Sequence, residues 1–231
     1  MSSIIHITNK FDTLKKILSE RSFRLFYCRE VFYLGDKVAS SAVHPMVSFS
    51  EYTIRTINKQ NITYGKFGIG LKRDWVAKHK LHPVLYFDRN SLVATALTDL
   101  LKARRKKDKE QLSARVKLSI MTIKCFTKNA VGYNSFFDIV DFNFKAEKEW
   151  RYVPTKSQID NGLISQTKSL YEKRPTYYDN KLKDFPLRFK MKDIEHIFVE
   201  TEKQRIELAQ TFGIAESLIK LSKWSTSLKK S

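Results

Sequence analysis

Most of the chain carries short apolar runs with the length and pattern of strands rather than of helices. The run 64–71 is unusually rich in glycine, with Gly65, Gly68 and Gly70 in a chain that has 7 glycines. Because glycine inside a strand lets another backbone or a ligand approach closely, we expect a close approach at this strand. The expected strands span 4–8, 23–32, 46–49, 64–71 and 83–87.

The spacing of apolar residues predicts helices in three further places. Leu14, Ile17 and Leu18 fall on one helical face directly after the first strand. Short helices are also expected over 74–79 and over 201–212, where the second begins with the capping-box-like sequence TEKQ.

The segment 91–128 is predicted to form a helical hairpin inserted between strands. Two sets of apolar positions have helical spacing, and a charged run, 102–109, lies between them as the expected turn. The expected buried faces are Leu92, Ala96, Leu100 and Leu101 in the first helix and Leu112, Val116, Ile120 and Ile123 in the second.

The rest of the chain returns to strand character over 136–153, has no clear period over 154–180 and contains two short strands within 187–200. Because strands and helices do not alternate regularly, we predict an α+β fold with a mixed or antiparallel sheet core. A single domain over 1–231 is expected, with a flexible basic tail over 222–231.

The net charge of +19 favours an anionic partner, meaning nucleic acid (DNA or RNA) or a negatively charged surface, although a merely basic soluble protein would show the same balance. Residues 102–128 carry 10 Lys and Arg against 2 acids, a net of +8. If the charged turn binds phosphates, the contacts depend steeply on salt; the alternative is a solvated turn. The candidate nucleic-acid-binding residues are Lys102, Arg104, Arg105, Lys106, Lys107 and Lys109.

Several kinds of site have no signature in the chain. It has no P-loop motif, no apolar run long enough to span a membrane, and two cysteines without a CxxC pair. His79 and His82 have no third ligand nearby, so no metal site is expected. The cysteine usage and the absence of a leader predict a cytoplasmic protein.

A dispersed set of polar residues is the best candidate for chemistry. His6 lies in the first strand and Ser48 in a later one. Glu147 and Glu149 follow in a late strand, where residues two apart point the same way, so both would share a face with Arg151. Two such carboxylates repel one another and need a compensating cation or a use.

One use is glycosidic chemistry, because breaking a sugar C–N or C–O bond passes through an oxocarbenium-like state that a carboxylate stabilises. The order His6, Ser48, Glu149 resembles that of ADP-ribosyltransferases, and the opening HIT followed by LKKIL resembles DarT-type transferases, which modify DNA. This resemblance implies NAD as co-substrate, an ADP-ribosyltransferase-like sheet, and Glu147 as a fourth catalytic candidate. A charged edge strand and a buried, hydrogen-bonded His6 are the structural alternative. The candidate NAD-binding residues are His6, Thr8, Ser48 and Ser50.

A second resemblance covers more of the chain, from about residue 6 to about residue 208. It is carried by HIT, PMVSFSEY, YGKFGIGLKRDW with HPVLY after it, EKEWRYV and DIEHIFVETEKQ. These segments resemble the AbiGi family of bacterial abortive-infection proteins. The resemblance implies anti-phage defence and an antitoxin role beside a toxin-like partner. It implies no established catalytic residue, so the role of Glu149 rests on residue order alone.

Two functions follow, and the position of the two glutamates separates them. A binding module, meaning an antitoxin or regulator that binds nucleic acid or a cognate toxin, predicts Glu147 and Glu149 exposed or salt-bridged on an open surface. A transferase that uses NAD to modify nucleic acid or protein predicts them in a cleft with His6 and Ser48.

Overall fold

A computed structural model describes residues 2–134 and 137–226, and it has the predicted α+β fold. Within these residues most strands join one nine-stranded, largely antiparallel sheet, and three pairs of short strands lie beside it. The path along the large sheet is β15 (Ile219–Leu221), β14 (Ile194–Val199), β5 (Phe67–Leu71), β1 (Ser2–Thr8), β4 (Lys37–Thr53), β11 (Glu149–Tyr152) and β6 (His82–Pro83), and β3 (Phe26–Leu34) and β12 (Gln166–Thr167) also pair with β4.

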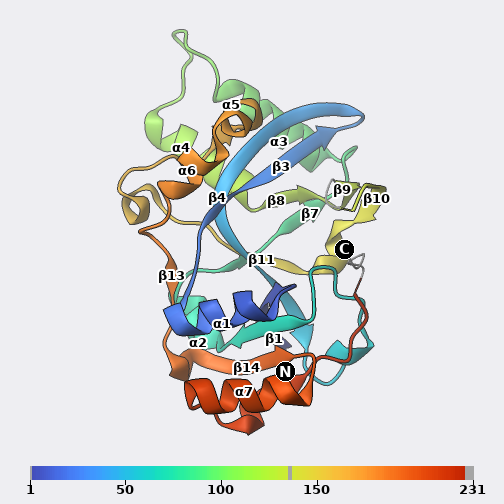
Figure 1. The fold of residues 1–231 in the computed structure, drawn as a ribbon. Coiled ribbons are helices and arrows are strands. Elements are labelled where there is room, and N and C mark those ends of the chain that lie inside the picture. The colour runs from blue at the N-terminus through green and yellow to red at the C-terminus, as the bar shows by residue number, and fades with distance from the viewer. Residues whose placement is uncertain (1, 135–136, 227–231) are drawn as a thin grey trace.

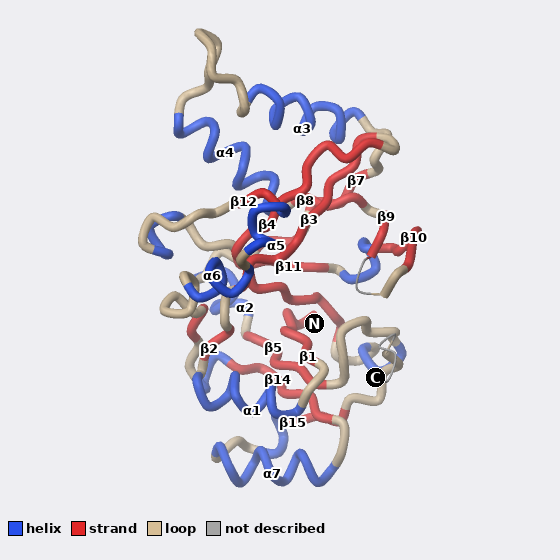
Figure 2. Tube along the Cα trace, turned by 45° about the horizontal axis from the view of Figure 1, so that its top comes forward, coloured by secondary structure: helices blue, strands red, loops and turns tan. Residues whose placement is uncertain are grey.

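The 17-residue strand β4 joins the upper and lower parts of the molecule, as Figure 1 shows. Its first half pairs with β3 and β12, and its second half pairs with β11 and β1. Figure 2 shows the same arrangement from a second direction, with β1, β5, β14 and β15 below and β3 above. β4 therefore places the N-terminal strand close to β11, which lies far along the chain.

Helices α1 (Phe11–Glu20) and α7 (Glu202–Phe212) pack on the lower part of the sheet. The predicted apolar face of α1, formed by Leu14, Ile17 and Leu18, is buried. These residues belong to the main hydrophobic core, which the sheet shares with the helices.

The glycine-rich strand β5 lies between β1 and β14, and the expected close approach is confirmed. A Cβ atom on Gly70 would lie 2.7 Å from Ser3 Oγ. Gly65 lies in the loop before β5, because the strand begins at Phe67. The φ angle of Gly65 is +137°, and a Cβ there would lie 2.3 Å from the carbonyl oxygen of Thr8, so only glycine fits.

The upper part contains the predicted helical hairpin, formed by α3 (Leu92–Ala103) and α4 (Ala114–Cys125). The expected faces are largely wrong, since Leu92 is 88% exposed and Val116 and Ile123 are also exposed. These helices have apolar residues on several sides, so periodicity alone does not select one face, and packing of α3 on β3 and β4 decides instead. The buried residues are Ala94, Leu97, Thr98 and Leu101 in α3 and Ile120, Met121, Lys124 and Cys125 in α4.

The strand expected over 136–153 is interrupted. A 3₁₀ turn, Phe144–Glu147, separates β10 (Ile139–Asn143) from β11, and Phe136 lies outside the described residues. The segment 154–180, expected as a long loop with one short helix, contains β12 and two short helices. The remaining elements are β2 (Ser22–Phe23) paired with β13 (Leu187–Arg188), β7 (Leu85–Phe87) with β8 (Thr127–Asn129), β9 (Val131–Asn134) with β10, and the helices α2 (Arg73–Lys78), α5 (Lys168–Lys173) and α6 (Pro175–Asn180).

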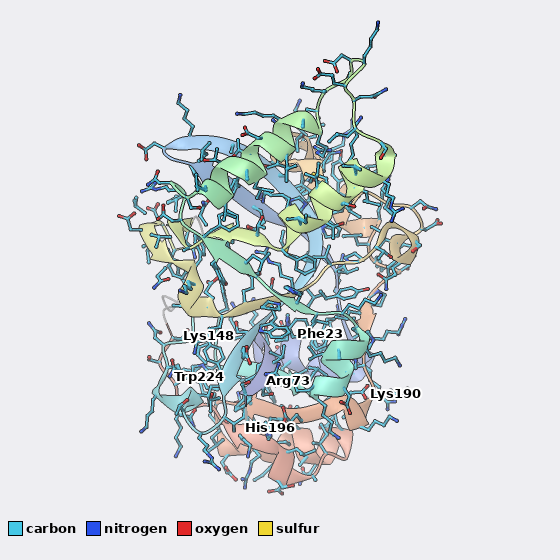
Figure 3. All side chains as sticks on the ribbon, turned by 180° about the vertical axis from the view of Figure 1, so that it is seen from behind. Phe23, Arg73, Lys148, Lys190, His196 and Trp224 are labelled. Carbon is cyan, nitrogen blue, oxygen red and sulfur yellow. The ribbon has the colours of Figure 1, made fainter. Side chains whose placement is uncertain are left out.

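The last described segment, 222–226, packs on the lower part of the molecule. Trp224 is fully buried in a second, smaller core, where its ring meets Phe198 at 5.3 Å between centroids. Figure 3 shows Trp224 there, seen from behind. Residues 227–231 of the expected tail lie outside the described residues. Among the residues that are described, no helix is long and apolar enough to cross a membrane.

Candidate functional site

The sheet splits between β1 and β4, and a cavity opens at the split. The two strands pair only as far as Ile5 opposite Ser50. Beyond that point β1 stays with β5 through Thr8, and β4 stays with β11 through Val47. The diverging strands leave a gap in the sheet, and residues of both strands line the cavity there, among them His6 and Ser48.

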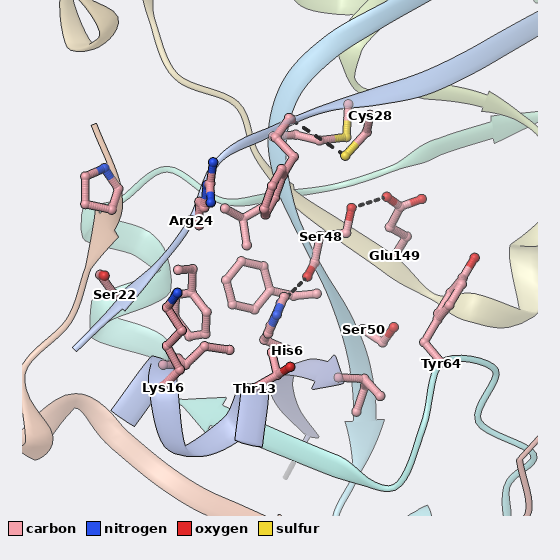
Figure 4. A pocket seen from close by; sticks show the side chains of 18 of the residues that line it. His6, Thr13, Lys16, Ser22, Arg24, Cys28, Ser48, Ser50, Tyr64 and Glu149 are labelled. Atoms are coloured by element: carbon pink, nitrogen blue, oxygen red, sulfur yellow. Dashed lines mark hydrogen bonds between the residues drawn. The ribbon is translucent and has the colours of Figure 1, made fainter. Parts of the chain in front are cut away.

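The cavity has a volume of about 880 Å³, within the range of about 300–1,000 Å³ that small-molecule sites occupy. Figure 4 shows it with Glu149 at one side, Lys16 and Arg24 at the other, and His6 between them. We call the first side the inner end, which comprises Ser48, Tyr64, Lys128, Glu147 and Glu149. We call the second side the outer end, which comprises Lys16, Arg24, Lys183 and Arg188.

His6 lies at the split and is neutral near pH 7. Its Nδ1 atom is 2.9 Å from the carbonyl oxygen of Ser48. Because a carbonyl oxygen only accepts, Nδ1 carries the proton and Nε2 is left as an acceptor. Burial lowers the pKa of His6, and the bond to Ser48 opposes this only in part. The rings of Phe23 and Phe49 pack beside the imidazole, at 4.9 and 5.6 Å between centroids.

Glu149 accepts four hydrogen bonds at the inner end. Its Oε1 accepts from Ser48 Oγ and from Arg151 Nε, each at 2.8 Å. Its Oε2 accepts from Arg151 Nη2 at 3.0 Å and from Lys128 Nζ at 3.2 Å. Arg151 is fully buried and also donates to Glu30 at 2.5 Å. Burial raises the pKa of Glu149, but Arg151 and Lys128 outweigh it and hold that pKa well below its usual range, so the carboxylate is ionised.

Lys128 joins the two glutamates of the inner end. Its Nζ lies 3.4 Å from Glu147 Oε2 and 3.2 Å from Glu149 Oε2. Burial lowers the pKa of Lys128, but the surrounding carboxylates, Glu149 above all, outweigh burial, so the pKa is raised and the ammonium stays charged. Glu147 also accepts from the hydroxyl of Tyr64 at 2.7 Å, and burial raises its pKa against the attraction of Lys128. The environment therefore separates the pKa values of the two carboxyls, as acid and base roles require.

The predicted shared strand face of the two glutamates is wrong, although the residues do meet. Glu147 ends the 3₁₀ turn, Lys148 adopts a left-handed conformation with φ of 47°, and β11 begins only at Glu149. The two carboxylates come together because both bind Lys128. Ser50 lines the cavity as well. Thr8 is buried at the end of β1, outside the set of lining residues.

A family model described as "Putative abortive phage resistance protein AbiGi, antitoxin" matches residues 11–200. The chain belongs to the AbiGi family. Membership gives it a role in abortive infection, on the antitoxin side. The match includes Ser48, Lys128, Glu147 and Glu149 and begins after His6. No curated protein and no solved structure matches the chain.

In this AbiGi protein the basic run 102–109 lies at the tip of the helical hairpin (Figures 1 and 2), and none of its residues lines the cavity. Lys102 pairs with Asp99 at 3.1 Å, and Lys106 pairs with Glu110. Arg104 is only half-exposed. Three cations of the run are exposed, namely Arg105, Lys107 and Lys109. None of them forms an ion pair with another described residue.

Sequence reasoning missed Lys128, Tyr64 and the cations of the outer end. Lys128 follows the hairpin and contributes to its charge, but β8 carries it into the cavity. These residues come from separate segments that only the tertiary fold brings together, so no local spacing marks them. Across 2–134 and 137–226, no three His, Cys, Asp or Glu side chains lie close enough together to bind a metal ion.

Proposed function

We propose that this AbiGi protein binds NAD in the cavity and transfers ADP-ribose to a nucleic acid or protein target. The observation that carries the proposal is the hydrogen-bonded series from His6 to Ser48 to Glu149 across the split in the sheet. These residues lie in a cavity large enough for a dinucleotide rather than on an open surface. An antitoxin of this kind acts by chemically changing its target.

The chemistry requires a carboxylate that is ionised beside the reacting sugar. Glu149 fits, because Arg151 and Lys128 keep it charged. In the transfer, the C–N bond between ribose and nicotinamide breaks and nicotinamide leaves with the electron pair. A target nucleophile then bonds to the anomeric carbon and loses its proton to water. The negative charge of Glu149 stabilises the oxocarbenium-like state between these events.

Glu149 has no spare acceptor site, since four donors surround it. Ser48 Oγ keeps two lone pairs while it donates to Glu149, so a ribose hydroxyl can donate to Ser48 without displacing it from the carboxylate. Ser48 therefore orients the carboxylate in the complex with NAD as well, and the neutral His6 offers Nε2 as a second acceptor.

The direct test incubates the purified protein with NAD and with each of two targets, a single-stranded oligonucleotide and the cognate toxin. Mass spectrometry then detects any covalently attached ADP-ribose. We expect attachment to one of the two targets, and none with the Ser48→Ala variant. A matched control, Glu216→Gln, alters an exposed carboxylate outside the cavity and keeps full transfer. Absence of ADP-ribose on both targets would contradict the proposal.

A second activity, nucleic-acid binding by the hairpin tip, is favoured by the three exposed cations Arg105, Lys107 and Lys109. Such contacts go to phosphates and do not read base sequence.

We further infer a cytoplasmic site of action, where nucleic acid and NAD are both present. A cognate toxin is the partner that the family's antitoxin role calls for, and the basic tip and the cavity are separate surfaces from which it could be bound.

A further inference from the structure

The outer end of the cavity gathers four cations from three segments of the chain. Lys16 comes from α1, Arg24 follows β2, and Lys183 and Arg188 come from the segment that ends in β13. Among the lining residues, the acid beside them is Glu20, whose Oε1 lies 3.8 Å from Lys16 Nζ. The formal charge of the outer end is therefore strongly positive.

The outer end lies beside aromatic residues that also line the cavity, Phe23 and Phe26. β2 and β13 pair with Phe23 opposite Leu187 and Ser22 opposite Arg188, and both apolar residues are buried. Arg24 stacks over the ring of Phe26 at 4.8 Å. A guanidinium that stacks on a ring keeps the N–H groups of its edge for an anion.

The inner end has the opposite balance. Three carboxylates face two cations there, which leaves a formal charge of −1. At the outer end four cations face one carboxylate, which leaves +3. The inner-end count takes Lys128, Glu147 and Glu149 together with Glu30 and the buried Arg151, which bridges Glu30 and Glu149. The outer-end count takes Lys16, Arg24, Lys183, Arg188 and Glu20. Arg29 also lines the cavity and is left out because Glu172 pairs with it at 3.5 Å.

NAD carries a charge at each end that is complementary to that of the cavity. Its nicotinamide ring is positive, the ribose beside it gains positive charge as the bond breaks, and its diphosphate is negative. We propose that the outer end is a diphosphate subsite, with Arg24 and Arg188 as its principal ligands. The dinucleotide then lies across the cavity with its phosphates near α1 and its reacting ribose at Glu149. This inference rests on the proposed function for the choice of NAD, and on the charge distribution for the orientation.

The test measures the binding of two probes by calorimetry. ADP carries the diphosphate without nicotinamide, and nicotinamide riboside carries the reacting end without phosphate. In the double variant Arg24→Gln/Arg188→Gln we expect ADP to bind about 10- to 100-fold more weakly, since each lost contact is a charge-assisted hydrogen bond. Binding of nicotinamide riboside should change less than about threefold.

A matched control, Lys192→Gln/Lys203→Gln, removes two exposed cations outside the cavity and should leave both affinities unchanged. Unchanged ADP binding in the Arg24→Gln/Arg188→Gln protein, or an equal loss in the control, would overturn the subsite. The single variant Arg24→Lys should recover part of the ADP affinity, which a merely unfolded site would not do.

The outcomes separate this subsite from the proposed transfer. A protein that binds ADP through Arg24 and Arg188 but modifies no target contradicts the transfer and supports the subsite. A protein that transfers ADP-ribose with an unchanged KM for NAD in the double variant supports the transfer and removes the subsite.

Discussion

The indole Nε1 of Trp224 donates a 2.8 Å hydrogen bond to the carbonyl oxygen of Gly65. Gly65 adjoins Tyr64, whose hydroxyl donates to Glu147 at the inner end of the cavity. Lys66 donates in turn to the carbonyl of Trp224. The C-terminal segment therefore fixes the loop that carries Tyr64, and it connects the smaller core to the candidate site.

Replacing Trp224 tests this connection. Trp224→Phe keeps an aromatic ring but leaves the Gly65 carbonyl without its indole donor, so we expect a loss of about 1–3 kcal/mol in the free energy of unfolding. Trp224→Ala also empties part of the core and should cost about 3–5 kcal/mol. Urea unfolding followed by circular dichroism measures both. The control Tyr177→Phe alters an exposed ring and should change stability by less than about 0.5 kcal/mol. A Trp224→Phe protein as stable as the wild type would show that the bond contributes nothing.

Glu149→Gln is expected to destabilise the protein. The strand pattern alone predicts little change in stability, because relief of the repulsion from Glu147 offsets any lost pairing with Arg151. The structure overturns this expectation, because Glu149 is buried and compensates Arg151 and Lys128. Removing one partner of a buried ion pair typically costs about 3–5 kcal/mol. The urea midpoint measures the loss, and an unchanged midpoint would contradict the buried network.

His44 should make stability depend on pH. Its side chain is fully buried in β4, and burial, helped by the positive charges of Lys124, Arg151 and Arg104, lowers the pKa of His44 to about 3. In the unfolded chain the pKa is about 6.5. The unfolded state therefore takes up a proton first, so the stability contribution is present above about pH 6.5 and is lost as the pH falls toward 3.

Unfolding measured between pH 7 and pH 5 checks this, with His44→Gln as the comparison. The slope from one such group approaches about 1.4 kcal/mol per pH unit. The difference in unfolding free energy between the wild type and His44→Gln should narrow as the pH falls. Parallel curves would mean that His44 takes up its proton equally in both states.

The hairpin tip should contribute salt-dependent binding to nucleic acid. Replacing Arg105, Lys107 and Lys109 by Ala removes the three exposed cations, so the slope of log K against log salt should fall by about 2.7 for duplex DNA. A filter-binding series at several salt concentrations measures the slope. The change should leave the fold intact, because the three residues lie in the exposed turn between α3 and α4.

The control for that series replaces Lys192, Lys203 and Lys223 by Ala. These three lysines are exposed outside the hairpin tip, and replacing them removes the same amount of positive charge. An equal change in slope for both triple variants would assign the effect to net charge. An unchanged slope for the tip variant would identify the tip as a solvated turn.

How far the sequence predicts this molecule depends on whether the information is local. The strand with His6, the helix with Leu14 and the hairpin follow from periodicity, and so does the close approach at Gly70. The convergence of His6, Ser48 and Glu149 was expected from their order, and the structure brings them together. Their chemical roles stay a proposal.

What the sequence does not predict is set by contacts between distant segments. The buried faces of α3 and α4 depend on packing against β3 and β4, because both helices have apolar residues on several sides. The sequence groups Lys128 with the basic residues of the hairpin. In the structure it lies in β8 and binds both Glu147 and Glu149. Trp224 lies in a segment whose serines and lysines indicate a flexible tail, yet its ring is fully buried.

Release of nicotinamide from NAD tests the central claim most directly. The rate is measured for the purified wild type, for Ser48→Ala and for the control Glu216→Gln, with the urea midpoint of each. Ser48→Ala removes one uncharged donor and leaves the ion pairs of Glu149 in place, so it separates chemistry from stability better than Glu149→Gln. We predict release by the wild type and by Glu216→Gln, and a rate about 10²- to 10³-fold lower for Ser48→Ala at a similar midpoint, if Ser48 positions the group that stabilises the transition state. No release by the wild type, or equal release by Ser48→Ala, would contradict the account.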